Sequence, residues 1–247
     1  MKELLSNLSQ FDILLSVFLL SLPLGSFYNV VAQRTLSSES FLSFDERSRC
    51  DSCGHQLHWN DLMPVLSWLL LKGKCRYCKT HVPGFYSLWE FFTAVSYTFI
   101  IYRFGFTVEA LIQISLFTIL IWSSVTDYIK RTVPTHFIII GYSFITTLVI
   151  YSDMMNDPLE TFTIPLMALL CLYLLGLRVD TELIISDYLL YGLIAISSEQ
   201  SIAIITLIMA AIGQSIGRFL SKEPAHHYFI PYLTWSLLIV HLVVFII

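Results

Sequence analysis

The chain has 247 residues, of which 56% are hydrophobic and 13% are charged, and its mean hydropathy is +0.72. These values exclude an ordinary soluble globular domain and predict an all-α polytopic membrane protein. The formal net charge of −4 predicts no partner, because in a membrane protein the side on which each charge lies matters more than the sum. No basic tract with interleaved aromatic residues indicates nucleic-acid binding.

Apolar runs long enough, or nearly long enough, to cross about 30 Å of hydrocarbon predict about eight transmembrane helices. They lie at about 12–32, 85–103, 107–126, 136–152, 161–177, 183–197, 199–217 and 229–247. Residues 1–20 carry one lysine and no small-residue cleavage site, so we expect a retained first span and not a removed signal peptide. The expected domains are a first transmembrane helix at 1–32, a polar segment at 33–84 and a membrane domain at 85–247.

The basic residues orient these predicted helices. If both termini lie outside the cytoplasm, twelve of the fourteen lysines and arginines fall on the cytoplasmic side, and only Lys2 and Arg103 fall on the other. The twelve are Arg34, Arg47, Arg49, Lys72, Lys74, Arg76, Lys79, Lys130, Arg131, Arg178, Arg218 and Lys222. The polar segment is therefore predicted to be cytoplasmic, and Asp127 and Asp187 are predicted to lie at one depth, at cytoplasmic ends of their spans.

Four cysteines of the polar segment form two pairs, Cys50-x-x-Cys53 and Cys75-x-x-Cys78. Two such knuckles about twenty residues apart are typical of a tetrahedral four-thiolate zinc site, because each knuckle turns its two thiolates toward a single ion. With four protein ligands no coordination position stays open for catalysis. The sequence thus predicts a small zinc-ribbon-like segment in which Zn²⁺ is structural.

Two alternatives to this zinc site remain open. The pairs could be disulfides, although a reducing cytoplasm disfavours them, and a nearby histidine could replace one cysteine. The histidines concerned are His55, His58 and His81. Cys171 stands alone in the fifth predicted span, where we expect it to pack as a small apolar residue.

Acidic residues at the membrane edge are expensive and by default indicate a functional site. A lone Asp127 would more simply cap its helix, extend to the interface or pair with Lys130 or Arg131. The prediction of Asp187 at the same depth favours an apposed pair, in which two carboxyl groups share one proton. The ionised group then takes a proton from the attacking water while the protonated one binds the carbonyl oxygen of the peptide bond.

The second member of this pair has rivals in the stretch RVDTELIISD at 178–187. Asp180 lies seven residues before Asp187 and would share roughly one helix face with it. Glu182 is also acidic. Asp180 lies nearer the loop, so a hydrated charge beside Arg178 is its simpler interpretation.

Two further stretches, PLGSFYNVVAQR at 23–34 and TDYIKRTVP at 126–134, are distinctive. They resemble segments of the type IV prepilin peptidases, a family of membrane aspartic enzymes. The first stretch is similar to a glycine-serine-phenylalanine segment of that family, and the second is similar to its first catalytic aspartate motif, which points to Asp127. The cysteine pairs, MPVLSWLLLKGKC between them, and GFYSLWEFFTA with Glu90 also match. The stretch IISDYLLYGL carries Ile184, Ser186 and Leu189 where the family usually has two glycines and a lysine, and isoleucine does not allow the close backbone approach of glycine.

The resemblance implies an aspartic endopeptidase of the bacterial inner membrane. Its catalytic residues would be Asp127 and Asp187, and its substrates would be prepilins or pseudopilins, cut after the glycine that ends a basic leader. Many members also N-methylate the new terminus with S-adenosylmethionine. Glu90, Asn29 and Arg34 are candidates for substrate or cofactor binding, with helix packing and interface anchoring as equal alternatives.

Two other classes of function compete with the peptidase. In a noncatalytic assembly or docking factor the ribbon would bind partners and the acids would only set topology. A proton-coupled transporter would carry its acids near the middle of the membrane, whereas these are predicted at span ends. The partners expected are therefore a prepilin-like protein and membrane lipid, without nucleic acid.

Overall fold

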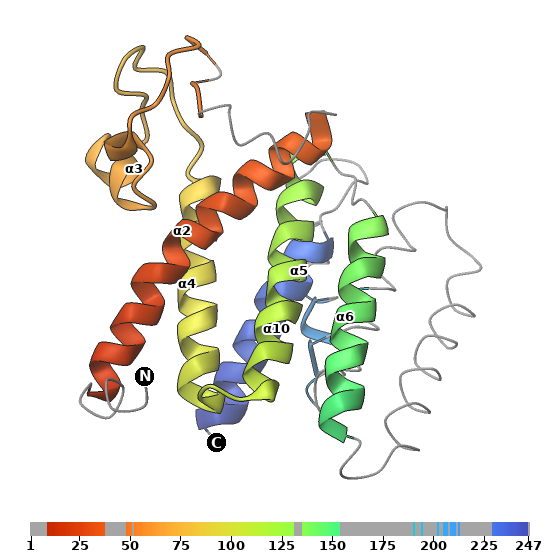
Figure 1. Cartoon of the computed structure of the whole chain (residues 1–247). Helices are drawn as coiled ribbons and strands as arrows, with labels where there is room; N and C mark the ends of the chain where they lie inside the picture. Colours follow the sequence, from red (N-terminus) through yellow and green to blue (C-terminus); the bar gives the residue numbers. More distant parts are fainter. Residues whose placement is uncertain are drawn as a thin grey trace. The chain divides into compact units, whose positions relative to one another are not determined.

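In the computed structural model, the regular elements of the described part are helices and one 3₁₀ turn (Figure 1). That part covers residues 9–37, 48–50, 52–130, 135–153, 190, 194, 202, 205–206, 208–210, 212 and 229–246. Its helices are α2 (Gln10–Ser37), α3 (Leu66–Leu70), α4 (Phe85–Phe104), α5 (Val108–Lys130), α6 (Thr135–Asp153) and α10 (Phe229–Ile246), with the 3₁₀ turn η1 (Trp59–Asp61). Within these ranges the only extended pairing is two isolated antiparallel bridges, so the predicted helical class is confirmed there.

Two helices of the described part are long and apolar enough to cross a membrane, at Gln10–Thr35 and Val108–Ile129. They correspond to the first and third predicted spans. The predicted spans at 85–103, 136–152 and 229–247 coincide with α4, α6 and α10, which are helical. The remaining three, at 161–177, 183–197 and 199–217, lie wholly or largely outside the described residues. Eight spans therefore stay a prediction.

The chain divides into two compact units, Met1–Gly105 and Phe106–Ile247. In the first unit α2 packs along α4, and Gly25 makes this approach possible. A Cβ atom built on Gly25 would lie 2.7 Å from the Cα atom of Glu90 and 3.0 Å from Oγ1 of Thr93. Small residues at helix contacts allow such backbone approach in membrane proteins. The two polar side chains of Tyr28 and Tyr97 meet in the same contact, with 3.1 Å between their hydroxyl oxygens.

We expect Gly25→Ala to destabilise this helix pair by about 1–3 kcal/mol, because the added methyl group meets backbone that cannot rotate away. Thermal unfolding of the purified protein in detergent measures the effect. Leu24→Ala is the matched control, since Leu24 immediately precedes Gly25 in α2 and is 42% exposed. Equal unfolding temperatures for Gly25→Ala and wild type would contradict this close contact.

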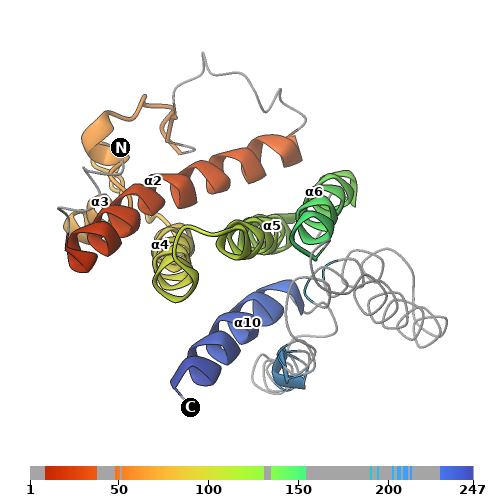
Figure 2. The same ribbon diagram turned by 60° about the horizontal axis from the view of Figure 1, so that its bottom comes forward.

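In the second unit α5 lies between α6 and α10 and contacts both (Figure 2). Gly141 of α6 sits directly against the side chain of Ile119, so a larger residue would not fit there without movement. On the other side, Oγ of Ser124 lies 2.8 Å from Oγ1 of Thr234 in α10. This buried hydroxyl contact ties α10 to the last two turns of α5, the part of the helix that carries Asp127.

Candidate functional site

The two cysteine knuckles fold as copies of one turn. In the first, the amide of Cys50 donates to the carbonyl of His55 at 3.0 Å, and the amide of Gly54 donates back to the carbonyl of Cys50 at 2.8 Å. The second knuckle repeats both bonds around Cys75, at 2.9 and 3.1 Å. The fifth residue of each turn has a positive φ, +67° at Gly54 and +61° at Lys79. Each turn therefore points its two sulfur atoms to one side.

The four sulfur atoms come together as the spacing predicts. The Sγ atoms of Cys50, Cys53, Cys75 and Cys78 all lie within 4.8 Å of one another, and all four cysteines are free thiols. The distance between Sγ of Cys50 and Sγ of Cys78 is 3.8 Å. A tetrahedron with zinc–sulfur bonds of about 2.3 Å has edges of about 3.8 Å, so this donor set fits Zn²⁺. The disulfide alternative is wrong for these four residues.

The thiols of this cluster do not ionise alike before an ion binds. The hydroxyl and amide of Thr80 lower the pKa of Cys78 to about 6. At Cys53 the backbone amide of His55 acts to lower the pKa, but partial burial and the neighbouring sulfurs of Cys50 and Cys78 outweigh it and raise the pKa to about 11. Binding of a cation to four thiolates must therefore release protons near neutral pH.

The three nearby histidines do not belong to this four-sulfur group. The ring of His55 instead packs on the ring of Tyr77, with 3.6 Å between centroids, and lies 6.5 Å from the ring of His58. The lining of the cavity described below includes His81. Among the described residues the cysteine-only donor set is thus the better fit for the ion.

We expect Gly54→Ala to weaken zinc binding by roughly fivefold, about 1 kcal/mol, because an L-residue is strained at this positive φ. No atom lies within 4 Å of the added Cβ, so the cost is conformational and not a clash. Competition with a zinc chelator measures the affinity. Gly54→Asn is the matched variant and should lose less, since asparagine tolerates the left-handed region better. Equal losses for both variants would contradict this explanation.

Asp61 braces the second knuckle, a role that the sequence analysis missed. Its Oδ1 accepts from Nε of Arg76 at 2.6 Å, and its Oδ2 accepts from the Tyr77 hydroxyl at 2.9 Å and from the His58 amide at 3.2 Å. The Asp61 side chain is only 4% exposed. Burial alone would raise the pKa of Asp61, but the hydrogen bonds from Arg76, Tyr77 and His58 outweigh it and lower that pKa.

We expect Asp61→Asn to accelerate zinc loss to a chelator by roughly threefold or more, because the neutral amide holds Arg76 and Tyr77 less strongly. The lowered pKa keeps Asp61 charged above about pH 4, the ordinary value, and its stabilisation is lost only as the pH falls through the folded pKa. The difference between variant and wild type should therefore be constant from about pH 6 to 8. A difference that changes across that range would contradict the assignment.

Polar residues of α2 and α4 join the ribbon to these two helices. The carboxylate of Glu90 accepts at Oε2 from the amide of Val65 at 2.8 Å. The side-chain amide of Asn29 donates to the carbonyl of Tyr86 at 3.2 Å, and that of Gln33 donates to the Tyr86 hydroxyl at 2.9 Å. Glu90 and Asn29 thus make packing contacts, one of the two roles that the sequence analysis left open.

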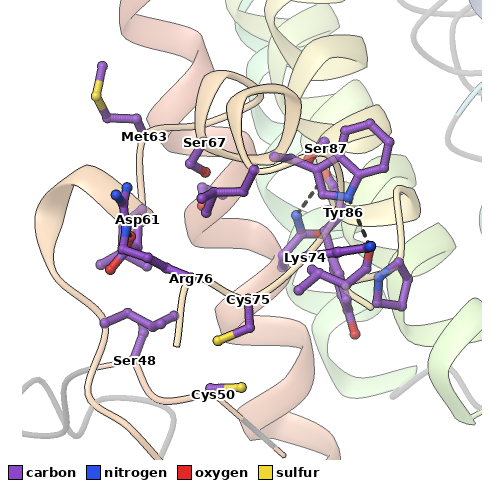
Figure 3. Close-up of a pocket in the computed structure, with 18 of the residues that line it drawn as sticks. Ser48, Cys50, Asp61, Met63, Ser67, Lys74, Cys75, Arg76, Tyr86 and Ser87 are labelled. Carbon is purple, nitrogen blue, oxygen red and sulfur yellow. Dashed lines mark hydrogen bonds and ion pairs between the residues drawn. The ribbon is translucent and has the colours of Figure 1, made fainter. Parts of the chain in front are cut away.

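A cavity of about 280 Å³ lies between the ribbon and these helix ends (Figure 3). Asn29, Gln33 and Glu90 line it from the helices, and Lys74 and Ser48 line it from the ribbon. Figure 3 shows Cys50 and Cys75 at one end of the cavity and Tyr86 and Ser87 at the other. Its lining carries both charge signs and several hydroxyl groups, so a polar small molecule is a chemically suitable occupant.

Asp127 is buried near the end of α5. It is 4% exposed, and it stands three residues before Lys130, the last residue of the helix. Three polar neighbours on the same helix, Ser123, Ser124 and Thr126, are fully buried with it. A carboxyl group in this setting is enclosed by the helix bundle and does not extend to bulk solvent, as a simple interface anchor would.

The partner predicted for Asp127 lies outside the described residues. Asp187 and both rivals, Asp180 and Glu182, fall in that part of the chain, as do the altered positions Ile184 and Ser186. The described residues therefore supply one carboxylate of the predicted pair. The pairing itself stays a prediction.

Residues 19–104 match the family described as "Bacterial Peptidase A24 N-terminal domain". This part of the chain, about a third of it, is similar to the N-terminal domain of A24 peptidases. The matched region contains α2, the four cysteines, α4 and the residues at the cavity, and it ends before Asp127. The A24 match thus covers the ribbon and the helix pair, with the cavity between them.

Curated relatives agree with this assignment. Over 124 residues the chain is 38% identical to a prepilin leader peptidase/N-methyltransferase of Myxococcus xanthus. This alignment covers 48% of the chain and 36% of the relative. An enzyme of the same name from Vibrio cholerae is 42% identical, over 29% of this chain and 31% of the relative. Another from Bacillus subtilis is 31% identical, over 52% of this chain and 51% of the relative. The chain thus spans about a third to a half of the length of these relatives. No solved structure matches it.

Proposed function

We propose that this chain is a membrane aspartic endopeptidase that removes the basic leader of type IV prepilins or pseudopilins. The A24 N-terminal region and the names of its relatives support the substrate class. The observation that carries the chemistry is the burial of Asp127 close to the end of an apolar helix long enough to span a membrane. A buried carboxylate costs folding free energy, so its presence there supports a functional role.

The proposed catalytic pair is Asp127 and Asp187. Within hydrogen-bonding distance the two carboxyl groups would share one proton, since two apposed negative charges repel each other strongly. The ionised group accepts a proton from water as the water attacks the scissile carbonyl. The protonated group donates a hydrogen bond to the carbonyl oxygen and stabilises its developing charge. Placed at the cytoplasmic edge, the pair would meet a leader where it joins the apolar helix of the substrate.

The ribbon has a structural part in this proposal. Zn²⁺ bound by Cys50, Cys53, Cys75 and Cys78 would have no open position, so it would hold the fold of residues 48–84 and take no part in hydrolysis. Glu90 then connects this segment to α4 through the amide of Val65. The ribbon is thereby fixed to the first helix pair, beside the cavity.

We extend the proposal to N-methylation, because the names of the relatives include N-methyltransferase, and we take S-adenosylmethionine as the methyl donor. The cavity of about 280 Å³ is close to the lower end of the range, about 300–1,000 Å³, that small-molecule sites occupy. Lys74 and Glu90 would face the carboxylate and the ammonium group of the methyl donor. Equilibrium binding of labelled S-adenosylmethionine to wild type and to Lys74→Ala tests this extension directly, apart from peptidase activity.

A noncatalytic docking factor is the second candidate, because Ile184 and Ser186 replace the glycines usual beside the second aspartate. Co-expression with a prepilin-like protein separates the two functions. We expect a shortened substrate on gels, and an uncut one when the glycine that ends its leader is replaced by valine. An uncut wild-type substrate that co-purifies with the chain would favour docking over hydrolysis.

A further inference from the structure

The short helix α3 presents an apolar face outside the helix bundle. Leu66, Leu69 and Leu70 are 49%, 57% and 80% exposed. They occupy positions i, i+3 and i+4, which lie on one side of a helix. Leu62 and Met63, just before α3, are 42% and 39% exposed and add to the same apolar stretch. We call Leu66, Leu69 and Leu70 the α3 face.

The opposite side of α3 fixes how this face points. The indole of Trp68 donates to the carbonyl of Val82 at 2.9 Å. Its ring packs so closely on Gly73 and Gly84 that a Cβ atom on either would lie 3.1 or 2.9 Å from it. The glycines hold Trp68, and Trp68 sets the rotation of α3. Because Trp68 faces the ribbon, the leucines on the opposite side of α3 point away from it.

A second contact fixes the depth of α3 relative to α4. The amide of Val65, the residue before α3, donates to Oε2 of Glu90 at 2.8 Å. Glu90 is the sixth residue of α4, about 7.5 Å along its axis from Phe85 at 1.5 Å per residue. Figure 1 shows α3 level with the end of α4 at which Phe85 begins. The α3 face thus lies beside the first turns of a predicted membrane helix, and not beyond them.

The residues around the α3 face indicate that membrane lipid covers it. At the same depth α4 exposes Leu88 and Phe91, each 48%, in a predicted span whose outer side meets lipid. Two exposed lysines, Lys72 and Lys74, follow α3 directly. A leucine face at bilayer depth with adjacent cations is typical of segments that lie in the interface of an anionic membrane.

We propose that the α3 face is a membrane-surface anchor, in which Leu66, Leu69 and Leu70 enter the boundary between headgroups and acyl chains. Lys72, which is exposed, then lies among anionic headgroups. The anchor holds the zinc ribbon at the bilayer surface. This inference does not depend on hydrolysis by the aspartates, so either proposal can fail alone.

Photocrosslinking in reconstituted vesicles tests the anchor. The full-length zinc-loaded chain carries benzoylphenylalanine in place of Leu70, or in place of Gln56 as the control, since Gln56 is exposed in the first knuckle. In phosphatidylglycerol vesicles we expect lipid adducts at position 70 to exceed those at position 56 by about fivefold or more. Equal labelling, or adducts at position 70 formed mainly with a second copy of the chain or with a co-reconstituted prepilin-like protein, would overturn the proposal.

A second variant guards against a local effect of the probe. With benzoylphenylalanine in place of Leu66, the double substitution Leu69→Ser and Leu70→Ser should reduce lipid adducts by about threefold. Zinc content and thermal unfolding should not change, because these leucines project out of the ribbon. Undiminished adducts in the double variant would refute a membrane role for this face.

Discussion

Asp127→Asn should abolish cleavage of a prepilin-like substrate, with a loss on the order of 10²–10⁴-fold or more in rate. Asparagine has nearly the shape of aspartate but neither accepts the proton of the attacking water nor shares one with a second carboxyl group. Because Asp127 is buried, bulk water cannot take over the role of its lost carboxylate, so the loss of activity should be larger than for a surface acid. Asp187→Asn should have the same effect. The appearance of shortened substrate over time measures both.

Asp180→Asn is the matched control for the second aspartate and should cleave normally. Zinc content and unfolding temperature should stay at the wild-type values in all three variants, which separates lost chemistry from lost folding. Full processing by Asp187→Asn would refute its assignment. An inactive Asp180→Asn together with an active Asp187→Asn would move the second catalytic role to Asp180.

Zinc is the second large effect. Metal analysis should find about one zinc ion per chain in the purified wild type and none in the double variant Cys50→Ser and Cys53→Ser. Structural zinc sites contribute about 10–16 kcal/mol of binding free energy, far more than a fifty-residue ribbon gains from its apolar contacts. Loss of the ion should therefore open residues 48–84 to limited proteolysis.

Cys171→Ser is the control for this experiment, because Cys171 lies in the fifth predicted span, far along the sequence from the two Cys-x-x-Cys pairs. It should keep its zinc and its resistance to protease. Retention of the ion by the Cys50 and Cys53 double variant would contradict a four-thiolate site. Protease resistance without zinc would show instead that the ribbon folds without the metal.

Local spacing in the sequence predicted more of the site than long-range pairing did. Each Cys-x-x-Cys pair determines its own turn, and the two turns need only one ion between them, so the four sulfurs could be foreseen. The helical class and the positions of the helices α2, α4, α5, α6 and α10 followed equally from apolar run lengths. Asp127 could be placed at a span end by the same reasoning, but its burial depends on how α5 packs.

Contacts between distant residues could not be read from local patterns. Nothing in the sequence around Asp61 shows that it meets Arg76 and Tyr77. The resemblance places Glu90 at an acidic position of the family, but the hydrogen bond that it accepts from the Val65 amide depends on the fold of the intervening ribbon. The apposition of Asp127 and Asp187 is a contact of this long-range kind.

The duplicated turn of the ribbon has one further consequence. The first copy has a glycine, Gly54, at its left-handed position, so its backbone is unstrained there. The second copy has Lys79 at the same position, and Asp61 holds this copy through Arg76. When the metal leaves, the hydrogen bonds from Arg76 and Tyr77 to Asp61 still hold the second copy, so disassembly of the ribbon should start at Cys50 and Cys53 and reach Cys75 and Cys78 later.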